Sequence, residues 1–173
     1  MKIVLLLLAL IGFTALHCGC TTKNLQIGDK APEFALLNQD GEMVHLADFK
    51  GKKVALYFYP KDSTPGCTQQ ACSLRDGFEL LHEAGITILG LSKGSVKSKQ
   101  HFIKKQHLTF PLLIATNDTL KDYGVNTGWL WLLRLPKRWT FLIDENGVIV
   151  GIIKDVDTKK HAQQILNGFN AIK

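Results

Sequence analysis

The segment YFYPKDSTPGCTQQACSLRD, residues 57–76, joins an apolar run typical of a strand to residues compatible with a helix. Pro60 ends the strand, and Pro65-Gly66 shapes a tight turn just before the helix. Cys67 therefore lies near a helix N-terminus, where unpaired backbone N–H groups and the helix dipole favour a thiolate over a thiol. Because the thiolate is the nucleophilic form, the segment predicts a reactive sulfur.

A second cysteine, Cys72, follows in the same predicted helix. In an ideal α-helix, residues 67 and 72 have Cα atoms about 8 to 9 Å apart, whereas a disulfide requires less than about 7 Å. We therefore expect two thiols in an intact helix, and a disulfide only after local unwinding. Capture of a sulfenic acid by the second thiol would then form a redox cycle. An inert structural disulfide is disfavoured by this geometry and by the short loop that it would close.

Thr64 places a hydroxyl three residues before Cys67. A threonine hydroxyl both donates and accepts hydrogen bonds, so it could hold a small polar oxidant such as a peroxide against the thiolate. Taken alone, this threonine is equally consistent with an ordinary turn or cap residue. The interpretation as a peroxide contact depends on its neighbours, Pro60 and Cys67.

Strand and helix signals alternate along the rest of the chain. A hairpin or meander is expected over 33–49. Apolar runs predict strands at 53–59, 86–91, 110–114, 139–143 and 148–153, and helical spacing predicts helices at 68–83, 96–106, 118–123 and 158–172. This order predicts a single α/β domain over residues 20–173, with a mixed sheet flanked by helices.

The first nineteen residues have the composition of an export signal. Lys2 precedes an apolar run, Ile3–Phe13, that is too short for a transmembrane helix of about 20 residues, and small residues follow. Gly19-Cys20 resembles the end of a bacterial lipobox, although His17 replaces the usual leucine. Lipidation at Cys20, simple cleavage and a retained anchor are the three alternatives. All predict an exported protein, periplasmic or membrane-associated, where a disulfide can persist.

The formal charge of +6 is modest for 173 residues and argues against nucleic acid as a partner. A lysine cluster without interleaved aromatic residues is interpreted as a solvated helix face: Lys97, Lys99, Lys104 and Lys105. Four histidines without metal-ligand spacing are expected to be solvated helix or loop residues: His82, His101, His107 and His161. No metal site is therefore predicted.

The run from Tyr57 to Asp76 resembles the active-site segment of peroxiredoxins, whose P-x-x-x-T-x-x-C pattern is matched by Pro60, Thr64 and Cys67. The spacing of the second cysteine is similar to that of the peroxiredoxin Q subgroup, also called bacterioferritin comigratory protein. Further similarities cover most of residues 25–173: GDKAPEF (28–34), GLS (90–92) and RWTFLID (138–144). The resemblance implies a thioredoxin-like fold and an antioxidant peroxidase that contributes to cell redox homeostasis.

The resemblance also implies a role for each matched residue. Cys67 would be the peroxidatic nucleophile, and Cys72 the resolving cysteine of the redox-active centre. Thr64 would contact the peroxide, and Pro60 would shield the pocket. Arg138 would stabilise the thiolate and polarise the O–O bond, which agrees with the permanent charge of a guanidinium.

The implied reaction reduces hydrogen peroxide or organic hydroperoxides and leaves a disulfide between Cys67 and Cys72, which an external dithiol reduces. No metal, flavin or nucleotide cofactor is needed. Thioredoxin is the usual reductant of the family, but the export signal favours a periplasmic or membrane-linked thioredoxin-like donor. The subgroup implies a monomer.

The main alternative is an exported dithiol-disulfide oxidoreductase or electron carrier of the thioredoxin superfamily. That class usually carries C-x-x-C, and Thr64 would be unexplained. The apolar run Trp129–Leu135 is open to two interpretations. It either packs over the active-site mouth or forms an exposed contact with a partner or a membrane surface.

Overall fold

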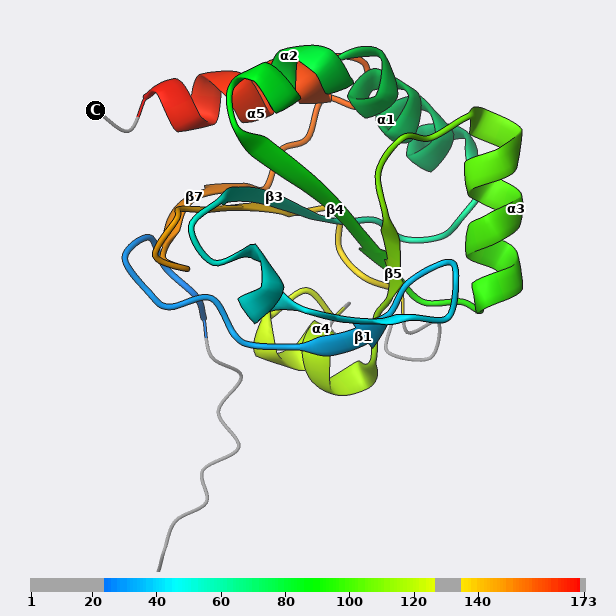
Figure 1. The fold of residues 1–173 in the computed structure, drawn as a ribbon, viewed down its shortest axis with the longest axis horizontal. Coiled ribbons are helices and arrows are strands. Elements are labelled where there is room, and N and C mark those ends of the chain that lie inside the picture. The colour runs from blue at the N-terminus through cyan, green and yellow to red at the C-terminus, as the bar shows by residue number, and fades with distance from the viewer. Residues whose placement is uncertain (1–23, 127–134, 172–173) are drawn as a thin grey trace, which may run out of the picture.

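A computed structural model describes residues 24–126 and 135–171, drawn in colour in Figure 1. Within these ranges, no helix is both long and apolar enough to cross a membrane. The predicted export signal, with Cys20, lies outside the described residues. So does the apolar run Trp129–Leu135, except for Leu135 itself.

Five strands form the central sheet in the order β5-β4-β3-β6-β7. The first three run parallel, and β6 is antiparallel to both β3 and β7. A separate two-stranded hairpin, β1-β2, precedes them and leads into the short 3₁₀ helix η1. The strands are β1 (Ala35–Leu37), β2 (Met43–His45), β3 (Lys53–Phe58), β4 (Ile86–Ser92), β5 (Leu112–Ile114), β6 (Thr140–Ile143) and β7 (Ile149–Ile153), and η1 spans Leu46–Phe49.

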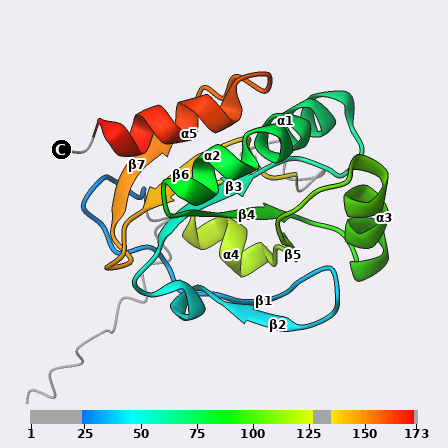
Figure 2. The ribbon, with the colours of Figure 1, turned by 45° about the horizontal axis from the view of Figure 1, so that its top comes forward.

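Helices cover both faces of this sheet and one edge (Figures 1 and 2). Helices α1, α2 and α5 lie together on one face, α4 and the β1-β2 hairpin lie on the other, and α3 stands beside β5. Their bounds are α1 (Pro65–Asp76), α2 (Phe78–Glu83), α3 (Val96–Gln106), α4 (Asn117–Asp122) and α5 (His161–Asn170). The predicted α/β fold with a mixed sheet is confirmed.

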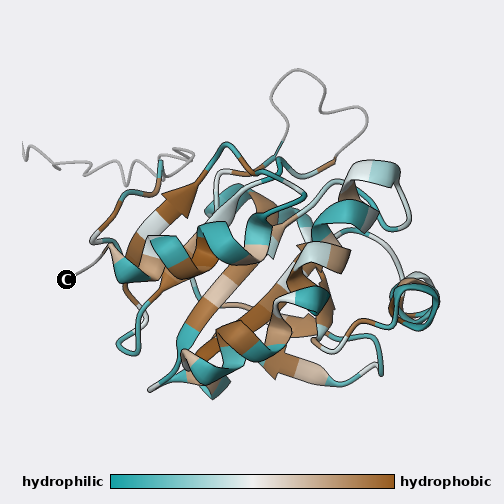
Figure 3. Ribbon diagram, turned by 90° about the horizontal axis from the view of Figure 1, so that it is seen from above, coloured by the Kyte–Doolittle hydropathy of each residue, from teal (hydrophilic) through white to brown (hydrophobic). Residues whose placement is uncertain are grey.

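Strand β3 divides the core in two because its side chains alternate between the faces of the sheet. Val54, Leu56 and Phe58 belong to the cluster beneath α4 and the hairpin. Ala55 and Tyr57 belong to the cluster beneath α1, α2 and α5, which also contains Cys67. Figure 3 shows the corresponding pattern, with hydrophobic strands at the centre and helices of mixed hydropathy around them.

The predicted elements agree with the structure except at one helix. The helix expected over 68–83 is two helices, because α1 begins earlier, at Pro65, and ends at the cap residue Gly77. A Cβ atom at Gly77 would lie 2.4 Å from the Cβ of Ala162 on α5. The glycine therefore permits close packing of the α1-α2 junction against α5.

We predict that Gly77→Ala destabilises the protein by about 1 to 3 kcal/mol, because the added methyl group overpacks this contact. Ala162→Gly should restore the space. The double variant is then expected to be more stable than the sum of the two single effects predicts. Urea denaturation of the four proteins measures this coupling, and strictly additive effects would contradict the steric explanation.

Candidate active site

Cys67 lies in the first turn of α1, as the sequence predicts. Thr64 is the N-cap residue in an extended conformation, and Pro65 occupies the first helical position, where its missing N–H costs nothing. The cysteine is only 1% exposed and packs in the cluster that contains Tyr57 and Tyr59. The sulfur is thus enclosed rather than placed at an open pocket mouth.

Arg138 reaches Cys67 because β6 runs antiparallel to β3. Tyr57 pairs with Thr140 in the ladder, and the amide of Phe58 donates to the carbonyl of Trp139 at 2.7 Å. The residue just before Trp139 is therefore held at the carboxyl end of β3. The loop that leads into α1 starts from the same end, so the topology joins two residues that are far apart in sequence.

The Arg138 side chain contacts the sulfur directly. Its Nη2 atom lies 3.4 Å from Cys67 Sγ. Glycine at position 66 leaves room for this contact, since a Cβ atom there would lie 3.3 Å from the same nitrogen. A guanidinium is always charged and has only N–H donors, so it stabilises a thiolate at this position electrostatically.

A chain of buried polar side chains continues behind Arg138. Its Nη1 donates to Gln70 Oε1, whose amide nitrogen lies 3.1 Å from His161 Nδ1. The other ring nitrogen, Nε2, lies 2.9 Å from Thr140 Oγ1. Gln70, Thr140 and His161 are each 0% exposed. The prediction that His161 is a solvated histidine is wrong, because the start of α5 packs against α1 and β6.

Gln70 was not predicted as a site residue, although its spacing from Cys67 in the sequence is a signal that indicates it. It stands three residues after Cys67 on the same helix, and such residues share a helix face. Nothing in the sequence indicates the long-range contact of His161. Burial and the nearby Arg138 charge lower the pKa of His161 to about 3, so its imidazole is neutral.

Thr64 and Pro60 lie in the loop between β3 and α1. The Thr64 hydroxyl donates to the backbone carbonyl of Lys61 at 3.1 Å, which leaves its oxygen lone pairs as acceptors. Pro60 lines a cavity of about 810 Å³ together with Leu135 and three lysines, Lys61, Lys93 and Lys97. Cys67 is not among the residues that line this cavity.

Cys72 is half-buried on α1 and faces α3. Its thiol lies 3.7 Å from Gln106 Oε1. Both Cys67 and Cys72 are free thiols in one continuous helix, as their spacing predicts. Since five residues also rotate the helix by about 140°, the two sulfurs point to different sides of α1.

A buried ion pair fixes the loop that precedes α1. Lys99 Nζ on α3 lies 2.9 Å from Asp62 Oδ1, and the lysine side chain is fully buried. Tyr59 Oη also donates to Asp62 Oδ1, at 2.7 Å. Burial lowers the pKa of Lys99, while Asp62 opposes this effect. The interpretation of Lys99 as part of a solvated helix face is therefore wrong, because this lysine turns inward to neutralise Asp62.

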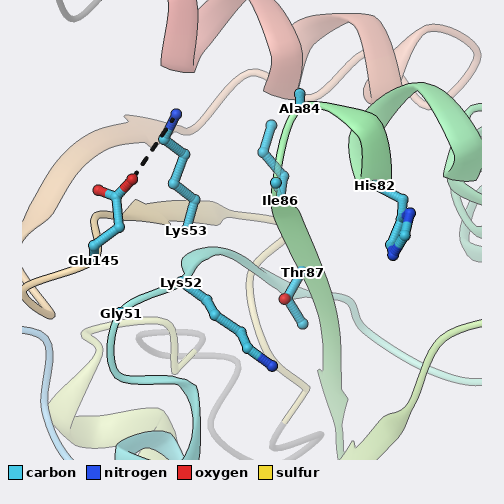
Figure 4. Close-up of a pocket in the computed structure, with 9 residues that line it drawn as sticks. Gly51, Lys52, Lys53, His82, Ala84, Ile86, Thr87 and Glu145 are labelled. Carbon is cyan, nitrogen blue, oxygen red and sulfur yellow. Dashed lines mark ion pairs between the residues drawn. The ribbon is translucent and has the colours of Figure 1, made fainter.

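Figure 4 shows a second cavity, of about 410 Å³, at the amino ends of β3 and β4. It contains a 4.0 Å ion pair between Lys53 and Glu145. Because Cys67 follows the carboxyl end of β3, this cavity is at the opposite end of the sheet and is not part of the thiol site.

Among residues 24–126 and 135–171, no group of three or more His, Cys, Asp or Glu residues could hold a metal ion.

Comparison with known proteins identifies the family. Residues 27–152 match the model of the AhpC/TSA family. Peroxiredoxin Bcp of Escherichia coli is 41% identical over 150 residues, which cover 83% of this chain and 94% of that protein. The chain belongs to the AhpC/TSA family and is a peroxiredoxin. A Bcp relative from Coxiella burnetii is 45% identical over 147 residues, or 83% of this chain and 97% of the relative.

Solved structures agree with this assignment. A PrxQ mutant of Xylella fastidiosa superposes with a TM-score of 0.78 at 30% identity, over 86% of this chain and 98% of that one. The bacterioferritin comigratory protein of Xanthomonas campestris gives a TM-score of 0.73 at 30% identity, over 80% of this chain and 90% of that one. The predicted peroxiredoxin Q resemblance and thioredoxin-like fold are confirmed. The enzyme is a thiol peroxidase, and the dithiol-disulfide oxidoreductase alternative is not favoured.

We predict that Asp62→Asn destabilises this peroxiredoxin by about 3 to 5 kcal/mol, because it leaves the buried Lys99 ammonium without an opposite charge. Asp76→Asn is the matched control, since Asp76 forms an exposed ion pair with Arg75 at 2.7 Å. That control should cost less than about 1 kcal/mol. Equal effects of the two substitutions in urea denaturation would contradict the role assigned to the buried pair.

His161 should make stability depend on pH. Its pKa is about 3 in the folded enzyme and about 6.5 in an unfolded chain. Between these values only the unfolded chain binds the proton, so the free energy of unfolding falls as pH decreases below 6.5, by up to about 1.4 kcal/mol per unit. Above about pH 6.5 the imidazole is neutral in both states, so the free energy of unfolding no longer changes with the titration of His161. The free energy of unfolding from urea denaturation should decline less steeply with falling pH in His161→Asn than in the parent enzyme. Equal slopes in the two proteins would contradict the buried, neutral state of His161.

Proposed function

We propose that Cys67 is the peroxidatic cysteine of this peroxiredoxin. Its thiolate attacks the hydroxyl oxygen of a hydroperoxide, the S–O bond forms as the O–O bond breaks, and the second oxygen takes a proton from the solvent and leaves as water or alcohol. Cys67 becomes a sulfenic acid. The observation that carries this proposal is the 3.4 Å contact between the Arg138 guanidinium and Cys67 Sγ.

Arg138 acts in two ways in this proposal. Its fixed positive charge stabilises the thiolate before reaction, and it lies where negative charge develops on the departing oxygen. Thr64 supplies a hydroxyl whose lone pairs can accept a hydrogen bond from the O–H group of the hydroperoxide. Pro60 shields the sulfur from bulk water. Because Cys67 is nearly fully buried, a peroxide enters by displacing neighbouring side chains.

Cys72 is proposed as the resolving cysteine. Its thiol condenses with the Cys67 sulfenic acid, so that a disulfide forms and water leaves. The geometry of α1 requires unwinding first, because the helix holds the two Cα atoms about 8 to 9 Å apart. A dithiol then reduces the disulfide by exchange. Both thiols are free in the structure, which corresponds to the reduced enzyme.

Hydroperoxides are the proposed substrates, and a thioredoxin-type dithiol is the proposed reductant. The solved Xanthomonas campestris relative is described as having alkyl peroxide reduction activity, which supports organic hydroperoxides as well as hydrogen peroxide.

We further propose that the enzyme is exported and monomeric, with residues 1–19 as a signal peptide and Cys20 as a candidate lipoprotein tether. An exported enzyme would need a periplasmic or membrane-linked thioredoxin-like donor.

The cysteine roles predict different defects. Cys67→Ser should abolish consumption of hydrogen peroxide in the presence of dithiothreitol, because no nucleophile remains. Cys72→Ser should still form one sulfenic acid at Cys67, detected by a sulfenic-acid probe, but should lose turnover with a thioredoxin-like reductant. Activity that persists in Cys67→Ser would reject this residue as the nucleophile, and unimpaired turnover in Cys72→Ser would reject the resolving role.

Export predicts a processed N-terminus. Mass spectrometry of the protein purified from its native membrane and periplasmic fractions should show a mature chain that begins at or near Cys20, with an added lipid mass if the tether is present. Cys20→Ser should then move the protein from the membrane to the soluble periplasmic fraction. An intact chain that begins at Met1 and stays in the cytoplasm would contradict export.

A further inference from the structure

The chain of hydrogen bonds behind Arg138 has a single consistent arrangement of donors and acceptors. A guanidinium only donates, so the Gln70 atom next to Arg138 Nη1 must be its amide oxygen. The amide nitrogen of Gln70 then faces His161 Nδ1 at 3.1 Å. That ring nitrogen must accept, and the proton of the neutral imidazole therefore lies on Nε2, next to Thr140 Oγ1.

We propose that His161 is a positioning residue for the peroxide reaction, because it holds the Gln70 amide in the one orientation that fixes the Arg138 guanidinium against Cys67. The residue touches neither the sulfur nor the substrate. It acts through two hydrogen bonds in succession, from Gln70 to His161 and from Arg138 to Gln70. This inference rests on the proposed role of Cys67 as the nucleophile.

The packing around His161 holds its ring in one orientation. It lies at the first position of α5, and its ring is wedged between α1 and β6 with no exposed surface. Tyr57 packs edge-on against the ring at a centroid distance of 6.0 Å. An imidazole that cannot turn presents the Nδ1 acceptor in a fixed direction, so a flipped Gln70 amide would place its oxygen against this acceptor as well as its nitrogen against the Arg138 donor.

Loss of the Nδ1 acceptor should therefore loosen Arg138. In His161→Leu the amide of Gln70 has no partner behind it, and the guanidinium is no longer held at 3.4 Å from Cys67 Sγ. His161→Asn keeps an acceptor at the position of Nδ1 and should rescue the arrangement. Gln70→Met breaks the same chain one step closer to Arg138 and provides a second test if His161→Leu does not fold.

The experiment measures the second-order rate constant for oxidation of reduced Cys67 by hydrogen peroxide, in proteins whose folded fraction is checked by circular dichroism. We expect His161→Leu and Gln70→Met each to lower the rate constant by about tenfold. His161→Asn should stay within about threefold of the parent enzyme. Gln69→Met is the matched control, because Gln69 is exposed on the same helix and accepts a hydrogen bond from Thr158, away from Arg138; it should leave the rate constant unchanged.

A double-mutant cycle separates positioning from a general structural effect. If His161 acts through Arg138, His161→Leu should have almost no further effect in an Arg138→Met background. Equal losses in the two backgrounds, or an unchanged rate constant in both His161→Leu and Gln70→Met, would overturn the proposal. The role of Cys67 itself would survive either result, because Cys67→Ser tests it separately.

Discussion

The antiparallel pairing of β3 with β6 is the constraint on which the site depends. It fixes Thr140 opposite Tyr57 and so holds the residue two positions earlier, Arg138, beside the turn that begins α1. The same turn places Cys67 at the helix N-terminus. The positive end of a helix, which is local in the sequence, and a cation 71 residues away therefore converge on one sulfur. A shift of one residue in this register would turn Thr140 to the other face of the sheet and break its contact with His161.

Two buried polar networks fix the side chains around Cys67. A partly satisfied polar network in a protein interior costs more than an apolar core, and here Arg138, Gln70, His161 and Thr140 satisfy one another in sequence. On the other side of the loop, the Lys99–Asp62 ion pair fixes the chain between β3 and α1. These two networks hold the start of α1 in place, whereas its later part carries Cys72 against α3. The proposed disulfide between Cys67 and Cys72 requires α1 to unwind. The proposed attack by Cys67 requires the start of the same helix to stay folded, so the two steps need different conformations of α1.

Local patterns in the sequence predicted most of the fold and the position of both cysteines in one helix. The apolar run of β3, the prolines and the spacing of Cys67 and Cys72 are all local features, and the structure agrees with each. The break at Gly77 was not predictable, because it depends on how closely α5 packs. His161 and Lys99 were wrongly interpreted as solvated because their burial also depends on tertiary contacts, with Thr140 and Gln70 for the histidine and with Asp62 for the lysine. A histidine or lysine carries no local mark of burial, and only the tertiary structure shows the partner that satisfies it.

If the Arg138 guanidinium makes Cys67 reactive, its removal should slow the alkylation of Cys67. The test is the rate of alkylation by iodoacetamide at pH 6, quantified in the peptide that contains Cys67. Arg138→Met should slow alkylation by about tenfold, because it removes the charge beside the sulfur while keeping an unbranched side chain. Lys137→Met is the control, since the Lys137 ammonium lies over the Trp139 ring, 4.7 Å from its centroid. It should leave the rate within about twofold of the parent enzyme. An unchanged rate in Arg138→Met, or an equal loss in both variants, would show that the Arg138 charge does not activate Cys67.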